Sequence, residues 1–223
     1  MDQNVIVMKT DNFPSAIKQI LVARRKRRIT HAMSKVTTKP SMKIIDIGCG
    51  IDGRSFENFI PPNYQVIGVD LKDPQKINHT YPDFQYIQQD AQDLSQFADK
   101  QFDLAVSIGL LEHVIEKEVF KKTALEIRRV AKQYIVMVPA KYCSIEPHYG
   151  LPFFPLFPYS IQVLLVKAFN LSNARENVKR DPQFIKKGII WRTNKEYQKA
   201  FPESKICITP TLEQIVIIKK DEI

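Results

Sequence analysis

Cysteine and glycine are scarce in this chain of 223 residues, with three and seven copies, and each scarcity excludes a class of protein. Cys49, Cys143 and Cys207 are far apart and form no C-x-x-C pair. This spacing argues against a disulfide framework or a zinc ribbon and fits a reducing compartment. The glycines follow no G-X-Y period, so collagen-like proteins are excluded.

Long apolar runs are missing as well. A membrane-spanning helix needs about 20 apolar residues. The only stretch of that length without Lys, Arg, Asp or Glu runs from Pro147 to Val166, and it contains four prolines. The N-terminus carries an acidic residue early and lacks the apolar segment of a secretory signal. We therefore expect a soluble, cytoplasmic protein.

Positive charge is concentrated in one place. The net charge is +9, and more than half of it lies in the basic run Arg24–Arg28. The basicity is therefore local and does not indicate a nucleic-acid-binding surface over the whole molecule. Such a run is by default the solvated face of a helix, although it could also hold an anionic acceptor or a membrane surface.

The N-terminal part of the chain has a pattern of its own. From Pro14 to Val36, apolar residues recur at helical spacing around the basic run, and a short linker ending at Pro40 follows. The sequence predicts a helical appendage over residues 1–40, which we expect to close over the binding site, and one main domain over residues 41–223.

Within the main domain, short apolar runs alternate with helical stretches, which is typical of βαβ units and a parallel sheet. Helices are predicted at Arg54–Ile60, from Ile115 to Val130, at Ser160–Phe169 and after the capping box at Thr193. The chain ends in two runs too close together for parallel pairing. We predict an α/β, doubly wound, Rossmann-like sheet of seven strands, mostly parallel, with a C-terminal antiparallel hairpin. The predicted strands are Lys43–Ile47, Gln65–Leu71, Phe84–Gln88, Phe102–Ile108, Tyr134–Val138, Lys205–Thr209 and Gln214–Lys219.

A glycine-rich turn follows the first predicted strand. Gly48-x-Gly50-x-x-Gly53 is expected to open a helix, and Asp70 lies at the end of the second predicted strand. Glycines let the backbone approach a ligand closely, and an acid at the end of the second strand accepts hydrogen bonds from ribose hydroxyls. The pattern predicts a cofactor that contains a nucleoside.

Asp46 bears on the identity of this cofactor. It precedes the first glycine by two residues, where its carboxylate would repel the pyrophosphate of a dinucleotide. The same carboxylate suits S-adenosylmethionine, which carries an ammonium and a sulfonium, while its own carboxylate would lie at the expected helix N-terminus near Arg54.

With these residues the sequence resembles the class I S-adenosylmethionine-dependent methyltransferases, in particular their type 11 branch. Four segments look like family motifs in the family's order: Asp46–Gly50, Val66–Leu71, Gln89–Leu94, and Phe102–Ser107 with Leu111–Val114. The family usually has a glycine where this chain has Asp52, so the contacts of this loop differ from the pattern. By this resemblance, the cofactor-binding residues are Asp46, Gly48, Cys49, Gly50, Asp70, Leu71, Asp90, Ala91 and Ile108.

Two histidines are candidates for the acceptor site. The segment from Glu146 to Phe157 follows the fifth strand and is rich in proline and phenylalanine, as expected of an apolar lid over an acceptor. We nominate His148 in this loop as general base and His113 as its competitor. Both histidines could equally be structural. The four histidines show no ligand spacing along the chain, so we predict no metal.

The resemblance implies transfer of the methyl group of S-adenosylmethionine to an O, N or C atom. The apolar lid favours a small or medium apolar or aromatic acceptor. Two alternatives stay open. One is an RNA methyltransferase that uses Arg24–Arg28, since a nucleic-acid partner is possible but not favoured. The other is a binding module without catalysis. A nicotinamide-dependent oxidoreductase is disfavoured by Asp46 and by the C-terminal hairpin.

Overall fold

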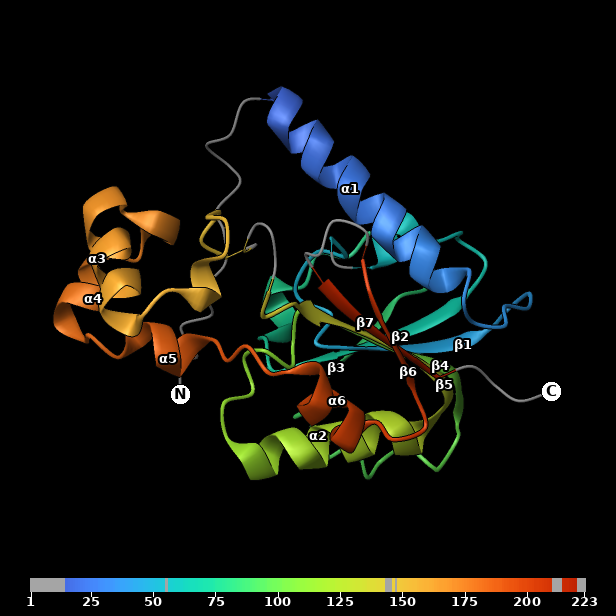
Figure 1. Ribbon diagram of the computed structural model, residues 1–223. Coiled ribbons are helices and arrows are strands. Elements are labelled where there is room, and N and C mark those ends of the chain that lie inside the picture. The colour runs from blue at the N-terminus through green and yellow to red at the C-terminus, as the bar shows by residue number, and fades with distance from the viewer. Residues whose placement is uncertain (1–14, 55, 143–145, 147, 210–213, 220–223) are drawn as a thin grey trace.

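The computed structural model describes residues 15–54, 56–142, 146, 148–209 and 214–219. Its strands form one mixed sheet of seven with the order β3-β2-β1-β4-β5-β7-β6 (Figure 1). The first five strands pair in parallel, and β7 runs antiparallel to both β5 and β6. The predicted fold class is confirmed. The strands are β1 (Lys43–Ile47), β2 (Gln65–Asp70), β3 (Gln85–Gln88), β4 (Phe102–Ile108), β5 (Ala131–Pro139), β6 (Lys205–Ile208) and β7 (Gln214–Lys219).

Two helices cover one face of the sheet. The amphipathic α2 (Lys117–Val130) buries Phe120, Ala124 and Ile127 there. The second helix, α6 (Asn194–Ala200), begins with the predicted capping box, in which Thr193 and Glu196 bond each other's backbone N–H. Because apolar side chains alternate along the strands, this face and the opposite one carry separate apolar clusters.

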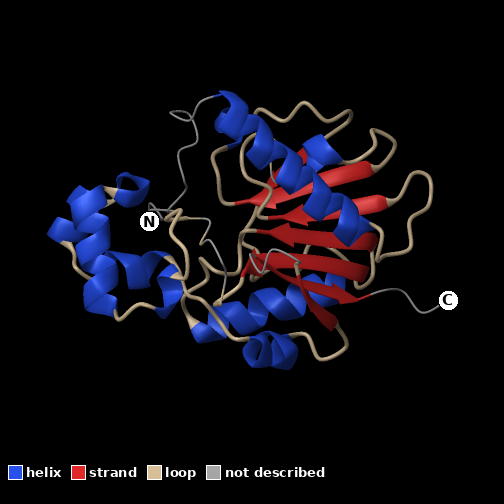
Figure 2. Ribbon diagram, turned by 45° about the horizontal axis from the view of Figure 1, so that its top comes forward, coloured by secondary structure: helices blue, strands red, loops and turns tan. Residues whose placement is uncertain are grey.

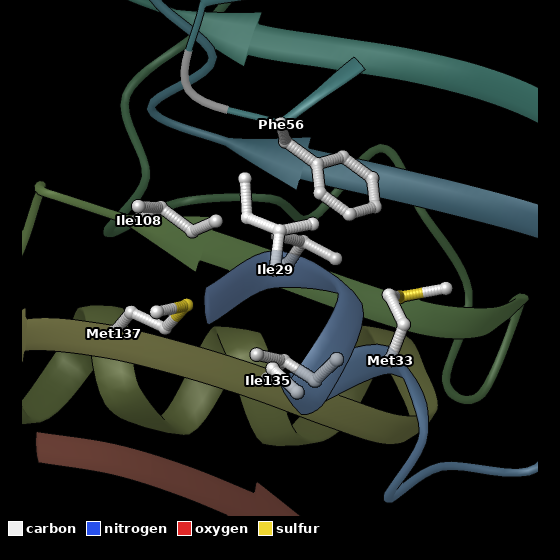
Figure 3. A pocket seen from close by; sticks show the side chains of 8 residues that line it. Ile29, Met33, Phe56, Ile108, Ile135 and Met137 are labelled. Carbon is white, nitrogen blue, oxygen red and sulfur yellow. The ribbon is translucent and has the colours of Figure 1, made fainter. Parts of the chain in front are cut away.

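The opposite face is covered by α1 (Ser15–Met33), which crosses the strands diagonally in Figure 1. Ile29 and Ala32 are only 2% and 1% exposed. Both line an apolar pocket, in which Figure 3 shows Ile29 beside Ile108 of β4 and Met137 of β5. The C-terminal half of α1 is therefore part of the core. The division of the chain at residue 40 stays a prediction.

The prediction of a helix at Arg54–Ile60 was wrong. Among its described residues, which exclude Ser55, that segment holds only the short 3-10 helix η2 (Glu57–Phe59), after which Ile60 is extended. Pro61 and Pro62 follow directly, and a proline disfavours helical backbone in the residue before it. In the described part of this connection, no crossover α-helix follows β1, and α1 from the N-terminal part of the chain covers part of the sheet instead.

A small helical lobe extends the chain between β5 and α6. It consists of α3 (Tyr159–Phe169), α4 (Arg175–Arg180) and α5 (Phe184–Gly188), with the 3-10 helices η4 (Phe154–Leu156) and η5 (Leu171–Asn173). Of these helices, the sequence predicted only α3. The lobe has an apolar cluster of its own. Figure 2 shows it beyond the carboxyl ends of the parallel strands, where ligands bind in such folds. Among the described residues, no helix is long and apolar enough to cross a membrane.

Candidate functional site

The glycine loop turns sharply at the carboxyl end of β1. The backbone N–H groups of Gly48 and Cys49 both donate to Val69 O of β2, at 2.7 and 3.3 Å. Gly48 and Gly50 have φ values of +81° and +72°, which favour glycine. A side chain at Gly50 would meet no atom within 4 Å, so this part of the loop is open to a ligand.

Asp70 braces the loop from the end of β2. Its Oδ2 accepts the N–H of Gly50 at 2.9 Å, and its Oδ1 accepts the N–H of Lys72 at 3.2 Å. Each carboxylate oxygen has a second lone pair, so both can still accept a hydroxyl. The neighbouring Leu71 is 52% exposed. The structure therefore places Asp70 and Leu71 beside the open part of the glycine loop, and their contact with a ribose stays a prediction.

Asp90 and Ala91 follow β3 at the same edge of the sheet. The Asp90 carboxylate accepts the backbone N–H and the side-chain amide of Gln92, at 3.0 and 2.8 Å. These contacts form an ordinary turn, and the binding of the cofactor by Asp90 and Ala91 stays a prediction. Ile108 ends β4 but lines the pocket beneath α1 (Figure 3).

Asp46 is fully buried and faces the α1 side of the sheet, beside the buried Glu57. Burial raises the pKa of Asp46 well above its usual value, and the charge of Glu57 raises it further. Burial likewise raises the pKa of Glu57. His79 Nδ1 lies 3.7 Å from Glu57 Oε2, and His79 Nε2 accepts the N–H of Gly53 at 3.2 Å. His79 therefore links the buried acids to the backbone of the glycine loop.

The buried acids give the protein a specific pH dependence. In the unfolded chain both carboxyls ionise at a pH of about 4, whereas in the folded chain they keep their protons to a higher pH. The unfolded state therefore releases protons first, and the free energy of unfolding falls as pH rises above about 4. We expect Asp46→Asn to raise the Tm, and to raise it more at pH 8 than at pH 5.

A thermal-shift series across pH checks this expectation. Asp99→Asn is the matched control, because the Asp99 side chain is 75% exposed and its ion pair with Arg129 is on the surface. A lower Tm for Asp46→Asn at pH 8 would show instead that Asp46 is a stabilised carboxylate.

Cys49 is 1% exposed, and its Sγ lies 3.4 Å from Gly50 O. Burial raises the pKa of the thiol, with the charges of Asp46 and Asp70 adding to the effect. A thiol that resists ionisation is a poor nucleophile. The structure thus supports packing of Cys49 beneath the turn.

The two candidate histidines come together, although they are far apart in sequence. His113 follows β4 and His148 follows β5, and their ring centroids are 5.3 Å apart. His148 Nδ1 donates to Glu146 Oε1 at 2.8 Å, and His113 Nδ1 donates to Gly188 O at 2.8 Å. Burial lowers the pKa of His113 to about 4, and His148 lowers it as well. Burial by itself would lower the pKa of His148. The hydrogen bond and the charge of Glu146 outweigh this effect, so the pKa of His148 is raised.

Several functional candidates around the histidines were missed in the sequence. Glu146 is fully buried and accepts four N–H groups: those of the His148 and Tyr149 backbone, His148 Nδ1, and Trp191 Nε1. The buried Glu112 lies next to His113, and burial raises its pKa to about 7. The spacing Glu146-x-His148 and the pair Glu112-His113 are visible signals, but only the fold joins them.

Arg192 fixes the loop that carries Glu112 and His113. It is 4% exposed and donates to Leu111 O at 2.9 Å and to Val114 O at 2.5 Å. Its guanidinium also lies 4.0 Å from the ring centroid of Phe120. The carbonyls on both sides of Glu112 and His113 are thus held in place.

The predicted lid has one phenylalanine in the lobe's core and two at its surface. Phe154 is fully buried and stacks on Tyr149, with ring centroids 4.3 Å apart. Phe153 and Phe157 are 49% and 37% exposed. Pro147 of this segment lies outside the described residues.

Part of the basic run contacts the site. Arg25 Nη1 donates to Arg54 O at 2.8 Å, just after the glycine loop. Burial lowers the pKa of Arg28 to about 10, and the charge of Arg25 adds to the effect. The run is therefore not simply a solvated face, because it joins α1 to the loop.

These residues fit S-adenosylmethionine. Gly50 leaves space for the close approach of a ligand, Asp70 can accept ribose hydroxyls, and both carboxylate oxygens of the buried Asp46 lack a hydrogen-bond partner among the described residues. The positive charge of the cofactor beside this acid would lower the pKa of Asp46 and favour its ionised form, and this contact stays a prediction. The helix expected near Arg54 is absent, so the methionine carboxylate would meet the backbone of the loop.

Comparison with known proteins agrees with this fit. Residues 45–136 match the family model described as "Methyltransferase domain". No curated protein sequence matches the chain.

Several solved structures share the fold. The magnesium protoporphyrin IX methyltransferase of Synechocystis, with bound S-adenosylmethionine, is 12% identical, with a TM-score of 0.52 over 91% of this chain and 80% of that one. The 1,6-didemethyltoxoflavin-N1-methyltransferase of Burkholderia thailandensis, with bound S-adenosylhomocysteine, is 13% identical, with a TM-score of 0.50 over 88% and 76%. A methyltransferase of Aquifex aeolicus is 12% identical, with a TM-score of 0.50 over 93% and 98%. The matching segment and the shared fold show that this chain contains a methyltransferase domain of the kind that uses S-adenosylmethionine.

Proposed function

We propose that this methyltransferase acts on an O, N or C atom of a small or medium apolar or aromatic acceptor, which binds between the glycine loop and the helical lobe. The observation that carries the proposal is the contact of His113 with His148 after the carboxyl ends of β4 and β5, where their ring centroids are 5.3 Å apart. In this fold, ligands bind in the crevice beyond those ends.

A short chain of contacts links the histidines to the glycine loop. A Cβ at Gly48 would come within 3.0 Å of Leu110 Cβ, so the two residues are already in close contact. Glu112 Oε1 lies near Gly109, at 3.7 Å from the position of a Cβ there. Residues 109–113 therefore form one short segment that contacts the glycine loop through Leu110 and carries His113.

S-adenosylmethionine supplies a methyl group on a sulfonium sulfur, which is already a good leaving group. The protein's tasks are to align the acceptor with that carbon and, for a hydroxyl or ammonium, to accept a proton. In this proposal, the side chains of His113 and His148 contact the reacting group of the acceptor. The nomination of His148 as general base stays a prediction.

Aromatic side chains support an apolar or aromatic acceptor. Trp191 Nε1 donates to Glu146 Oε1 at 3.3 Å, and the Trp191 ring lies 6.1 Å from that of Phe154. The side of the histidine pair that faces the lobe is therefore built from aromatic rings. For the RNA alternative, Arg25 of the basic run already donates a hydrogen bond within the protein, to Arg54 O.

Transfer of a labelled methyl group tests the proposal. The purified chain is incubated with labelled S-adenosylmethionine and a cell extract fractionated by size, with nuclease- and protease-treated samples as controls. We expect label in the small-molecule fraction, unaffected by either treatment. Label that disappears after nuclease treatment would favour the RNA alternative, and no transfer to any fraction would favour the binding module.

Asp70 gives a quantitative test of the cofactor site. Asp70→Ala removes a charged acceptor of two ribose hydroxyls, so we expect the affinity for S-adenosylmethionine to fall by about 2–4 kcal/mol in calorimetry. Asp99→Ala, at an exposed acid, should bind normally. The wild-type chain should bind S-adenosylhomocysteine but not NAD. An unchanged Kd for Asp70→Ala would remove Asp70 from the site.

A further inference from the structure

Glu112, His113 and His148 each present one possible ligand atom, and these three atoms lie within 4.8 Å of one another. We propose that the three side chains bind a divalent transition-metal ion, of the Zn²⁺ or Fe²⁺ kind, that holds the acceptor. The inference rests on the proposed function only in placing the acceptor here, since metal binding is measurable without turnover.

The hydrogen bonds of both histidines prepare them as ligands. A carbonyl oxygen can only accept, so the contact with Gly188 O puts the proton of His113 on Nδ1. His148 Nδ1 likewise donates to the buried Glu146. Each imidazole can therefore direct the lone pair of Nε2 at an ion. Histidine ligands in metalloproteins almost always donate their other N–H to a carboxylate or a backbone carbonyl, and here both kinds of partner are present.

Glu112 supplies the third ligand and an independent reason for a cation. Glu112 is only 2% exposed, and its Oε2 has no hydrogen-bond partner within the described part of the chain. A buried carboxylate oxygen without a partner is costly, and a bound cation would satisfy it. Arg192 bonds the carbonyls of Leu111 and Val114, so the backbone on both sides of Glu112 is held in place.

The ligand set indicates the class of metal. Two imidazoles and one carboxylate suit Zn²⁺ and Fe²⁺, whereas Mg²⁺ and Ca²⁺ prefer oxygen ligands. Ligands at about 2.1 Å from one ion lie about 3–4 Å apart, so the three ligand atoms would have to approach one another by up to about 1–2 Å.

Three protein ligands leave an open position for a hydroxyl of the acceptor, whose proton the ion would make easier to lose. In the transfer itself, the O–H bond breaks and its proton passes to water. The oxygen then bonds the methyl carbon as the carbon–sulfur bond of the cofactor breaks, which yields the methyl ether and S-adenosylhomocysteine.

The test measures metal binding by the full chain, after chelator treatment and without cofactor or acceptor. Calorimetry with Zn²⁺ and visible absorption with Co²⁺ should each show one ion per chain. The Co²⁺ spectrum should lack a thiolate charge-transfer band, because no cysteine is among the ligands. An excess of Mg²⁺ should not compete.

Variants of the three proposed ligands test whether the ion binds at these side chains. Glu112→Gln, His113→Ala and His148→Ala should each weaken binding at least about 10-fold, while His31→Ala, at an exposed histidine of α1, should bind as the wild type does. Glu112→Gln is nearly isosteric, and circular dichroism shows whether each variant is folded. The proposal is overturned if the wild type binds no ion, or if folded Glu112→Gln and the histidine variants bind it normally.

Turnover separates this proposal from the proposed function. If a chelator leaves methyl transfer intact and no ion binds, the metal proposal fails and the proposed function stands, with His148 as the candidate base. If one ion binds through Glu112 and the histidines but no fraction of the extract is methylated, the metal site stands and the proposed function fails.

Discussion

Replacing Glu146 with alanine is expected to abolish methyl transfer and to lower the free energy of unfolding by about 3–5 kcal/mol. Glu146 is fully buried, and its two carboxylate oxygens accept four N–H groups. Alanine would leave these donors without a partner in a dry environment. It would also release the ring of His148 and the indole of Trp191, so the acceptor site would lose its orientation together with stability.

Two further variants separate these effects, with chemical denaturation and labelled methyl transfer as the measurements. Glu146→Gln keeps the size of the side chain but turns one acceptor group into a donor, so we expect a folded protein with turnover about 10–100-fold lower. Glu118→Ala removes an exposed glutamate that pairs with Lys121, and should change neither quantity measurably. Normal turnover in Glu146→Ala would show that the orientation of His148 does not matter for the reaction.

The sheet was predictable mainly from its central strands β1, β4 and β5, which are buried on both faces. Such strands form short, nearly continuous apolar runs, and each of the seven predicted runs is a strand to within a few residues. The capping box at Thr193 was predictable because it depends on residues three apart in sequence. The turn of the C-terminal hairpin, residues 210–213, lies outside the described residues.

The helical lobe was less predictable. Its helices α4 and α5 are six and five residues long, too short for an apolar period to repeat. The missing helix after the glycine loop has a different cause. The glycine motif after the first strand favoured it, but Pro61 and Pro62 determine the backbone of Ile60, and α1 fills part of the space from a distant part of the sequence.

The cluster of two histidines and two acids at the proposed acceptor site could be predicted only in part. His113 and His148 were visible as candidates, but their meeting depends on β4 and β5 being neighbours in the sheet. Glu112 and Glu146 are acids next to or near these histidines, a signal that gains meaning only once the fold buries them. Metal-ligand spacing along the chain does not reveal ligands that come from the ends of two different strands.

Gly68→Ala should have the largest effect of any single methyl group near the cofactor loop. Gly68 lies in β2 next to Asp46, and a Cβ there would come within 2.3 Å of Phe84 Cζ and 2.8 Å of Cys49 Sγ. Overpacking of this kind costs about 1–3 kcal/mol and sometimes more. Phe84 stacks on His79, with ring centroids 3.9 Å apart, so a displaced Phe84 would also disturb the loop.

We therefore expect Gly68→Ala to lower both the Tm and the affinity for S-adenosylmethionine, although Gly68 has no predicted contact with the cofactor. The double variant Gly68→Ala/Phe84→Leu removes the ring atoms that clash, and should be more stable than Gly68→Ala alone. Gly50→Ala is the contrasting control. It meets no atom within 4 Å, but its φ of +72° strains an alanine by about 1–2 kcal/mol, and Phe84→Leu should not rescue it. Rescue of both glycine variants, or of neither, would show that the Phe84 ring is not what restricts position 68.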